Sequence, residues 1–216
     1  MKRNVVAIHP GALGDVLLAV PAIKKLGSQF PRHNILFIAR ASVSRLLAEC
    51  RVVDDWIPAE SQICSGLFAK FGCQSNELGS HLERCDVAVA WTEDVDGSLA
   101  NVLREYGVLK IWIQSPFSSA LQRKHQCERF LETIGESSVY GSGEDVLQIP
   151  DHLRKEGRIY LENKGIIKSR SLVLVHPGSG SIHKCLRPEK LACIIQQLQH
   201  REMSPVLLEG PADQDA

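Results

Sequence analysis

The residue best suited to chemistry in the first part of the chain is Asp15, which follows the turn Gly11-Ala12-Leu13-Gly14. The turn itself comes directly after a short apolar run that ends in His9-Pro10-Gly11. An aspartate carboxylate in this place can point into a cleft. Capping of the following helix is the commonest role of aspartate at such a position, so both interpretations stay open. His9 is expected to be a hydrogen-bonded loop residue rather than a catalyst.

A second loop, residues 178–184 with the sequence GSGSIHK, is suited to binding an anion. Its small residues expose backbone N–H groups at the start of a helix, where the helix dipole favours negative charge. Lys184 adds a full positive charge, so a phosphate group fits the loop. The alternative is an ordinary Gly/Ser turn followed by a solvated lysine.

Several familiar cofactor motifs are absent from the sequence. Neither loop has the Gly-x-Gly-x-x-Gly spacing of a dinucleotide site, and neither ends in Gly-Lys-Ser/Thr. The second predicted strand ends in Ala39-Arg40, where a dinucleotide site needs an acid. The eight histidines show no paired helical spacing, and the seven cysteines form no Cys-x-x-Cys pair. We therefore predict free thiols, no cofactor and no metal.

Both loops follow apolar, β-branched runs, 5–9 and 172–175, that are short enough to be buried strands. In α/β folds, ligands bind just past the carboxyl ends of parallel strands. The repeated pattern therefore predicts two similar α/β domains, and two such loops that face each other make a cleft.

Strands and helices alternate along the rest of the chain, which is typical of a parallel sheet. Further strands are predicted at 34–39, 52–57, 86–91 and 108–113, and a strand followed by a turn is predicted over 204–210. Helices are predicted at 16–26, 43–48, 97–106, 122–134, 151–163 and 188–199, with mixed helical segments within 64–84. Pro21 falls inside the first helical pattern and predicts a kink or a late start of that helix.

The composition predicts a globular, cytosolic protein. With 216 residues, 44% of them hydrophobic, the chain can bury packed cores. Lys+Arg and Asp+Glu both total 25, so no overall field attracts nucleic acid or an anionic membrane. Asp15 and Pro21 interrupt the first apolar stretch, which fits neither a signal peptide nor a membrane span.

A Gly- and Ser-rich segment, 135–143, precedes Pro150 and marks a predicted domain boundary. We predict a first domain over 1–150, a linker with a bridging helix over 151–170, and a second domain over 171–216. The second domain holds only a strand, a helix and a strand, which leaves most of a sheet uncovered. We therefore expect a fragment of a longer protein, with an incomplete second domain.

Three stretches of the chain resemble the glycosyltransferase family that contains the bacterial ADP-heptose:lipopolysaccharide heptosyltransferases (glycosyltransferase family 9). They are 11–26 (GALGDVLLAVPAIKKL), 125–135 (HQCERFLETIG) and 176–191 (HPGSGSIHKCLRPEKL), in the family's order. The resemblance implies an α/β fold of GT-B type. In that fold a Rossmann-like N-terminal domain with a parallel sheet binds the acceptor, and a second Rossmann-like domain, here truncated, binds the nucleotide-sugar donor.

The resemblance also implies roles for individual residues. Asp15 is then the general base for the acceptor hydroxyl, and Ser179, Gly180, Ser181 and Lys184 lie at the donor diphosphate. The implied reaction moves a heptose from ADP-heptose to the lipopolysaccharide inner core by inverting single displacement, without a metal. The acceptor, with its acid sugars and lipid A phosphates, is anionic and needs local cations. Candidate acceptor-binding residues are Gly14, Arg40, Arg45, Arg123 and Lys124, although each cation is ordinarily a solvated surface residue. Any contact with the inner membrane is expected to be peripheral.

Two departures from the family's pattern leave alternatives open. Lys184-Cys185-Leu186-Arg187 stands where the family has Lys-x-Trp-Pro, and the family's later Asp-Ser-Gly-x-x-His donor motif does not occur in the chain. The alternatives are an inactive truncated product, an acceptor-binding module, or another GT-B nucleotide-sugar enzyme such as an epimerase.

Overall fold

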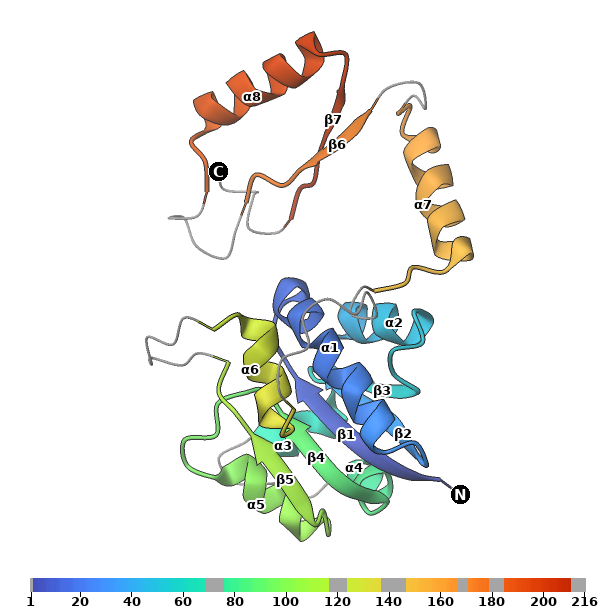
Figure 1. The fold of residues 1–216 in the computed structure, drawn as a ribbon, viewed down its shortest axis with the longest axis vertical. Coiled ribbons are helices and arrows are strands. Elements are labelled where there is room, and N and C mark those ends of the chain that lie inside the picture. The colour runs from blue at the N-terminus through green and yellow to red at the C-terminus, as the bar shows by residue number, and fades with distance from the viewer. Residues whose placement is uncertain are drawn as a thin grey trace. The chain divides into compact units, whose positions relative to one another are not determined.

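A computed structural model of the chain describes residues 2–68, 76–116, 124–136, 147–166, 171–178 and 185–210. The chain divides into two compact units, Met1–Pro150 and Asp151–Ala216 (Figure 1). Each unit is an arrangement of helices around parallel strands, so the expected α/β class is confirmed.

The first unit is built on a five-stranded parallel sheet with the strand order β3-β2-β1-β4-β5. The strands are β1 (Arg3–His9), β2 (His33–Ala39), β3 (Asp55–Pro58), β4 (Cys85–Ala90) and β5 (Lys110–Ile113). The last five residues of both β1 and β2 are fully buried. Continuous apolar runs of this kind are expected where helices cover both faces of a parallel sheet.

Helices pack on both faces of this sheet and form two core layers (Figure 1). One layer lies under α1 (Leu13–Gln29), α2 (Ala41–Glu49) and α6 (Gln126–Thr133). The other layer lies under α3 (Ser65–Phe68), α4 (Asn76–Leu82) and α5 (Ser98–Glu105), and the short 3-10 helix η1 (Gln62–Cys64) leads into α3. Alternate residues of β1 feed the two layers, Val5 one and Val6 the other.

The first helix is longer than its apolar pattern predicts. It begins at Leu13, three residues before the predicted start, and it continues through Pro21 to Gln29. The predicted late start at Pro21 is therefore wrong. The first turn is exposed and carries no apolar periodicity, whereas the buried face begins at Val16. Pro21 removes one hydrogen bond to the carbonyl of Leu17, a residue whose exposure lets water take that place.

Two predicted strand starts are wrong for the same physical reason. The strand predicted from residue 52 begins at Asp55, and the one predicted from residue 108 begins at Lys110. Val52 and Val108 are buried, but each donates its N–H back to the preceding helix, to Leu47 and Leu103 respectively. They are buried turn residues that pack under a helix end, and their apolar character imitates a strand.

The other predicted elements of the first unit lie within one or two residues of those found, apart from α6. That helix begins at Gln126, and the first two residues of its predicted range lie outside the described part of the chain. Gly97, which comes before α5, has a φ of 72°, a conformation that favours glycine.

The second unit contains α7 (Asp151–Asn163), β6 (Leu172–Val175), α8 (Pro188–His200) and β7 (Ser204–Leu207). The two strands pair in parallel, as a strand-helix-strand unit requires. Pro188 stands in the first turn of α8, where its missing N–H costs nothing. The last strand begins at Ser204 and ends at Leu207, within the range predicted for a strand and a turn. Neither α7 nor α8 buries any residue, and Leu172, Leu174 and Leu207 are at least 40% exposed.

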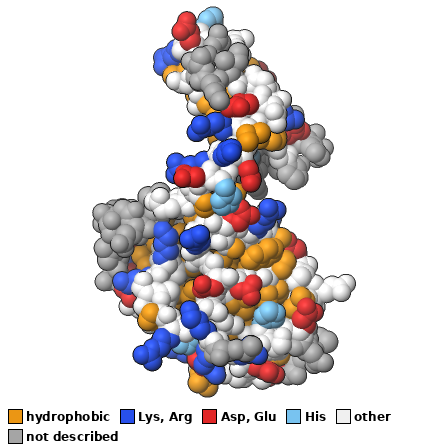
Figure 2. Space-filling model, turned by 90° about the vertical axis from the view of Figure 1, so that its right-hand side faces the viewer, with side chains coloured by type: hydrophobic (Ala, Val, Ile, Leu, Met, Phe, Trp, Pro, Cys, Tyr) orange, Lys and Arg blue, Asp and Glu red, His pale blue; other side chains and the backbone are white. Residues whose placement is uncertain are grey.

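The face of the molecule shown in Figure 2 carries charged side chains of both signs. Lys and Arg side chains alternate with Asp and Glu over the face shown in Figure 2. This distribution agrees with the zero formal net charge. Among the described residues, no helix is both long and apolar enough to span a membrane.

Candidate active site

The carboxyl ends of the five strands form the edge of the first unit at which a ligand is expected. The register places His9 beside Ala39, and Ala39 beside Pro58. On the other side of β1, Ala90 at the end of β4 pairs with Ile113 at the end of β5. The residues that follow these strands therefore meet along one edge, and the loop between β1 and α1 lies at its centre.

Asp15 lies at this edge, in the first turn of α1, and its side chain is exposed. The residue that caps the helix is Ala12, and no side chain forms a capping hydrogen bond there. Asp15 has no hydrogen bond or ion pair with any residue in the part of the chain that the structure describes. The helix dipole stabilises its negative charge. This geometry favours a carboxylate that is open to an incoming group over one that is used for capping.

Gly11 is required at its position because the ring of His9 fills the space that a side chain needs. A Cβ atom on Gly11 comes within 2.6 Å of Cε1 of His9 and 3.4 Å of Cβ of Asp15. The backbone N–H of Gly11 donates to Nδ1 of His9 at 3.2 Å, which confirms the expected hydrogen bond of His9. These three residues form one contiguous group at the start of α1.

His9 is buried, with 1% of its surface exposed. The centroids of the Trp91 and Phe130 rings lie 6.1 and 5.5 Å from that of the imidazole. Burial lowers the pKa of His9 to about 4, and the charge of Asp15 opposes this effect only in part. The imidazole is therefore neutral at pH 7 and forms no ion pair with Asp15.

A hollow of about 430 Å³ opens beside this loop and is lined by Pro10, Arg40, Ala59, Glu60 and Phe68. Glu60 accepts a 3.0 Å hydrogen bond from the backbone N–H of Ala41, which holds the pKa of this carboxyl below its usual value. The ring of Phe68 is 42% exposed. The hollow thus offers a cation, an anion and an apolar ring, a combination that suits a polyhydroxylated ligand.

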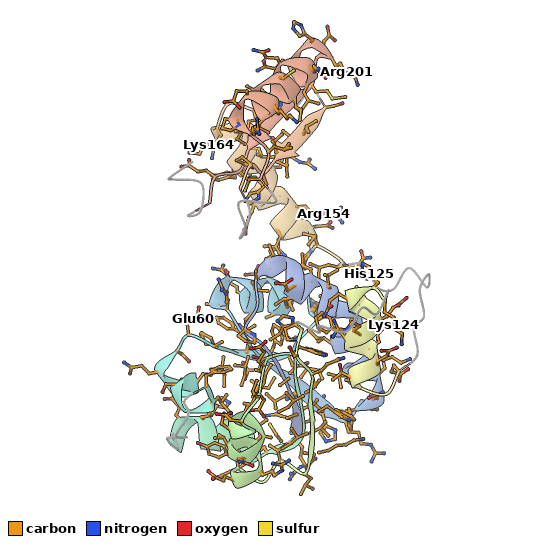
Figure 3. All side chains as sticks on the ribbon, turned by 90° about the vertical axis from the view of Figure 1, so that its left-hand side faces the viewer. Glu60, Lys124, His125, Arg154, Lys164 and Arg201 are labelled. Atoms are coloured by element: carbon orange, nitrogen blue, oxygen red, sulfur yellow. The ribbon has the colours of Figure 1, made fainter. Side chains whose placement is uncertain are left out.

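Of the predicted acceptor-binding cations that the structure describes, only Arg40 lies at this hollow. Arg40 lines it, whereas Arg45 on α2 pairs with Glu49 through a 2.8 Å contact between Nε and Oε1. Lys124 pairs with Glu132 of α6. Lys124 and Glu60 lie on opposite sides of the first unit (Figure 3).

The two remaining predicted acceptor-binding residues are Gly14 and Arg123. Gly14 is exposed in the first turn of α1, and a Cβ there meets no atom within 4 Å. Packing therefore does not require glycine at this position. Arg123 lies outside the described residues.

The predicted phosphate-binding residues Ser179, Gly180, Ser181 and Lys184 also lie outside the described part of the chain. The structure describes the elements on either side of their loop. Strand β6 ends at Val175, and α8 begins at Pro188. The loop therefore joins the carboxyl end of a strand to the amino end of a helix, and the binding role of its residues stays a prediction.

Glu60 and Phe68 line the candidate site, although no sequence motif indicates them. They follow β3 and η1, in a region where the predicted strand was displaced and the helices were indistinct. A place just past the carboxyl end of a strand is the signal that indicates Glu60, which comes two residues after the end of β3.

A second hollow, of about 420 Å³, lies between β5 and α5 and includes Asp94 and Arg104 in its lining. The two carboxylate oxygens of Asp94 accept the backbone N–H groups of Leu99 and Ala100, at 2.9 and 3.1 Å. Asp94 is thus used to hold the start of α5. Among the described residues, no group of three His, Cys, Asp or Glu side chains is arranged to hold a metal ion.

Comparisons with known proteins identify the fold of the chain. No model of a protein family matches it, and no curated protein matches it in sequence. Solved structures do match. The chain is similar to a glycosyl transferase of family 9 from Veillonella parvula, with a TM-score of 0.70, 15% identity, and coverage of 99% of this chain and 64% of that one.

Two further similarities are to Escherichia coli proteins. One is ADP-heptose lps heptosyltransferase II, with a TM-score of 0.70, 18% identity, and coverage of 100% of this chain and 66% of that one. The other is the heptosyltransferase WaaC with ADP-2-deoxy-2-fluoro heptose, with a TM-score of 0.61, 14% identity, and coverage of 98% and 71%. The predicted α/β fold of GT-B type is thereby confirmed. The chain spans less than two thirds of the length of the first two structures.

Proposed function

We propose that the chain is a glycosyltransferase of the heptosyltransferase kind and that Asp15 is its general base. The observation that carries this proposal is the exposed carboxylate of Asp15, which has no partner among the described residues and stands at the carboxyl edge of the sheet. A ligand-sized hollow opens beside the same loop. The similarity in fold to solved heptosyltransferases supports this reading.

The proposed reaction is a single inverting displacement. The acceptor hydroxyl oxygen forms a bond to the anomeric carbon of the donor sugar while the bond from that carbon to the diphosphate oxygen breaks. The proton of the hydroxyl passes to the carboxylate of Asp15, and the nucleoside diphosphate leaves with the electron pair. A positioned base of this kind contributes about 10²–10⁴-fold to the rate.

For the donor, we propose ADP-heptose, held without a metal ion or other cofactor. Solved structures that resemble this chain include WaaC with ADP and with ADP-2-deoxy-2-fluoro heptose. The loop 178–184 supplies backbone N–H groups and Lys184, which suit the negative charge that builds on the leaving diphosphate.

For the acceptor, we propose an anionic sugar of the lipopolysaccharide inner core on lipid A. Arg40 in the hollow beside the loop provides the positive charge, and Phe68 provides an apolar face for a sugar ring. Such an acceptor places the protein in the cytoplasm with peripheral contact at the inner membrane. Gly14 leaves open space next to Asp15 for the approach of the acceptor.

The test is turnover by the 216-residue chain with ADP-heptose and a truncated inner-core acceptor, followed by ADP release and by the mass of the product. Asp15→Asn keeps the shape of the side chain and removes the base, so kcat should fall by about 100-fold or more with ADP-heptose binding unchanged. Glu83→Gln, which removes an exposed acid next to the amino end of β4, is the matched control and should keep full activity. Normal turnover in Asp15→Asn contradicts the proposal, as does weaker donor binding with unchanged kcat.

A further inference from the structure

His9 is the buried polar side chain at the candidate site that the proposed reaction does not use. Its Nε2 atom is shut off from water and has no hydrogen-bond partner among the described residues. An unpaired polar atom of this kind costs about 1–3 kcal/mol, so an apolar side chain of similar size can pack more favourably here. An apolar side chain, however, has no acceptor atom in the place of Nδ1, which accepts the hydrogen bond from the Gly11 N–H.

The hydrogen bond from Gly11 fixes the state of the ring. Nδ1 accepts the hydrogen bond from the Gly11 N–H, so it carries no proton. The proton of the neutral imidazole therefore resides on Nε2. The ring is held between the rings of Trp91 and Phe130. Trp91 is tied in turn by its Nε1–H, which donates to Oγ1 of Thr133 in α6 at 3.3 Å. The clamp on Gly11 therefore rests on β1, on the residue that follows β4 and on α6 together.

We propose that His9 is a positioning residue, which clamps Gly11 through Nδ1 and so sets the direction of α1 and of the Asp15 carboxylate toward the acceptor hydroxyl. This inference rests on the proposed function for its last step, the action of Asp15. The clamp itself rests on geometry alone. Gly11 lies against both side chains, since a Cβ on it comes within 2.6 Å of His9 and 3.4 Å of Asp15.

The neutral state of His9 also keeps Asp15 available. Among the described residues, the charged group that acts on the imidazole is Asp15 itself, on α1. The aromatic neighbours are Trp91, directly after β4, and Phe130 on α6. A cationic imidazole here stabilises the charge of Asp15 and makes it a weaker base. A neutral ring holds the loop in place without that effect.

The first test reads the tautomer of His9 by NMR in the 216-residue chain. Two-bond correlations between ring protons and ring nitrogens should show a protonated Nε2 and an unprotonated Nδ1 from pH 5 to pH 8. Protonation of Nδ1, or an imidazolium ion at pH 7, overturns the proposal. This test needs no substrate, so it decides the clamp even if the chain proves inactive.

The second test compares His9→Asn with His9→Leu. Asparagine places an oxygen near the position of Nδ1, whereas leucine fills similar volume without an acceptor. In His9→Leu the amide of Gly11 should exchange with solvent about fivefold faster, as the loss of one hydrogen bond predicts, and His9→Asn should restore most of the protection. His33→Asn, on β2 at the amino end of the sheet, is the control and should leave Gly11 unchanged.

Activity separates the positioning role from simple stability. His9→Leu should lower kcat by about 10-fold to 100-fold with the KM for ADP-heptose unchanged, because a displaced base slows the chemical step rather than donor binding. His9→Asn should recover most of that loss. Equal effects of both variants on Gly11 exchange and on kcat show that only volume matters and overturn the proposal. A wild-type chain without turnover refutes the proposed function instead, and the NMR result stands apart from it.

Discussion

Arg40 donates a hydrogen bond from Nε to the carbonyl oxygen of Pro10 at 3.4 Å, and so ties the end of β2 to the loop that precedes α1. The same arginine forms the cap position of α2 and lines the hollow that contains Glu60. One side chain thus connects the loop of the candidate base with the surface proposed for the acceptor.

Replacement of Arg40 should weaken the use of the acceptor and leave the binding of the donor unchanged. We expect Arg40→Gln to lower kcat/KM for an anionic acceptor by about tenfold, the scale of one charge-assisted hydrogen bond. The KM for ADP-heptose should stay the same. Steady-state kinetics with each substrate varied in turn provides the measurement. Arg32→Gln, an exposed arginine next to the amino end of β2, is the control, and an equal loss in both variants points to a general effect of charge.

The low pKa of His9 predicts that the first unit loses stability in weak acid. The folded-state pKa of about 4 lies below the usual value near 6.5, so the unfolded chain takes up a proton first as the pH falls. The contribution of the neutral His9 to the free energy of unfolding is fully present above pH 6.5. It is lost as the pH falls from 6.5 to 4, by about 3 kcal/mol in total.

Urea unfolding at pH 7.5, 5.5 and 4.5 measures this loss. His9→Asn removes the titrating group, so the free energy of unfolding of the variant should change less over the same range. Parallel curves for the two proteins contradict a neutral, buried imidazole. The comparison between the proteins is needed because carboxyl groups also titrate near the lower end of the range. Asp86 is one example: its hydrogen bond from Arg3 is the chief cause that lowers the pKa of this carboxyl in the folded chain, so its contribution to stability begins to fall as the unfolded chain takes up a proton near pH 4.

The sequence alone predicts the elements whose apolar runs are bounded by turn residues. The limits of α7 and β6 agree with the structure to the residue, because each pattern begins and ends at a clear change of composition. The apolar pattern places Val52 and Val108 in strands, because burial in a turn and burial in a sheet leave the same apolar signature. Only the hydrogen bonds to the preceding helices distinguish the two.

The candidate site could be predicted only in part for a related reason. Asp15 is adjacent in sequence to the Gly-rich turn that exposes it, so the local pattern carries the information. The environment of His9 depends on Trp91 and Phe130, which lie more than 80 residues away along the chain. The hollow that contains Arg40, Glu60 and Phe68 likewise depends on strand order and register, which local patterns do not specify.

Lys184 should contribute to donor binding and to turnover if the loop 178–184 binds the diphosphate as proposed. We expect Lys184→Ala to weaken ADP binding by about 10-fold and to lower turnover as well, because the same charge stabilises the bound and the leaving diphosphate. Titration calorimetry with ADP and steady-state kinetics measure the two effects. Lys190→Ala, an exposed lysine on α8, is the matched control. Unchanged ADP binding and turnover in Lys184→Ala would contradict the proposed role and would show that Lys184 is an ordinary solvated lysine.

Gly11 and Gly14 stand three residues apart and should respond to alanine in opposite ways. A Cβ on Gly11 collides with the ring of His9, which cannot move aside because Trp91 and Phe130 enclose it. We expect Gly11→Ala to destabilise the first unit by about 1–3 kcal/mol, the usual cost of overpacking. A Cβ on Gly14 meets nothing within 4 Å, and alanine favours a helix by up to about 1 kcal/mol, so Gly14→Ala should be neutral or stabilising. Urea unfolding of both variants at pH 7.5 is the measurement, and a Gly11→Ala protein as stable as the wild type would show that His9 does not occupy the place described.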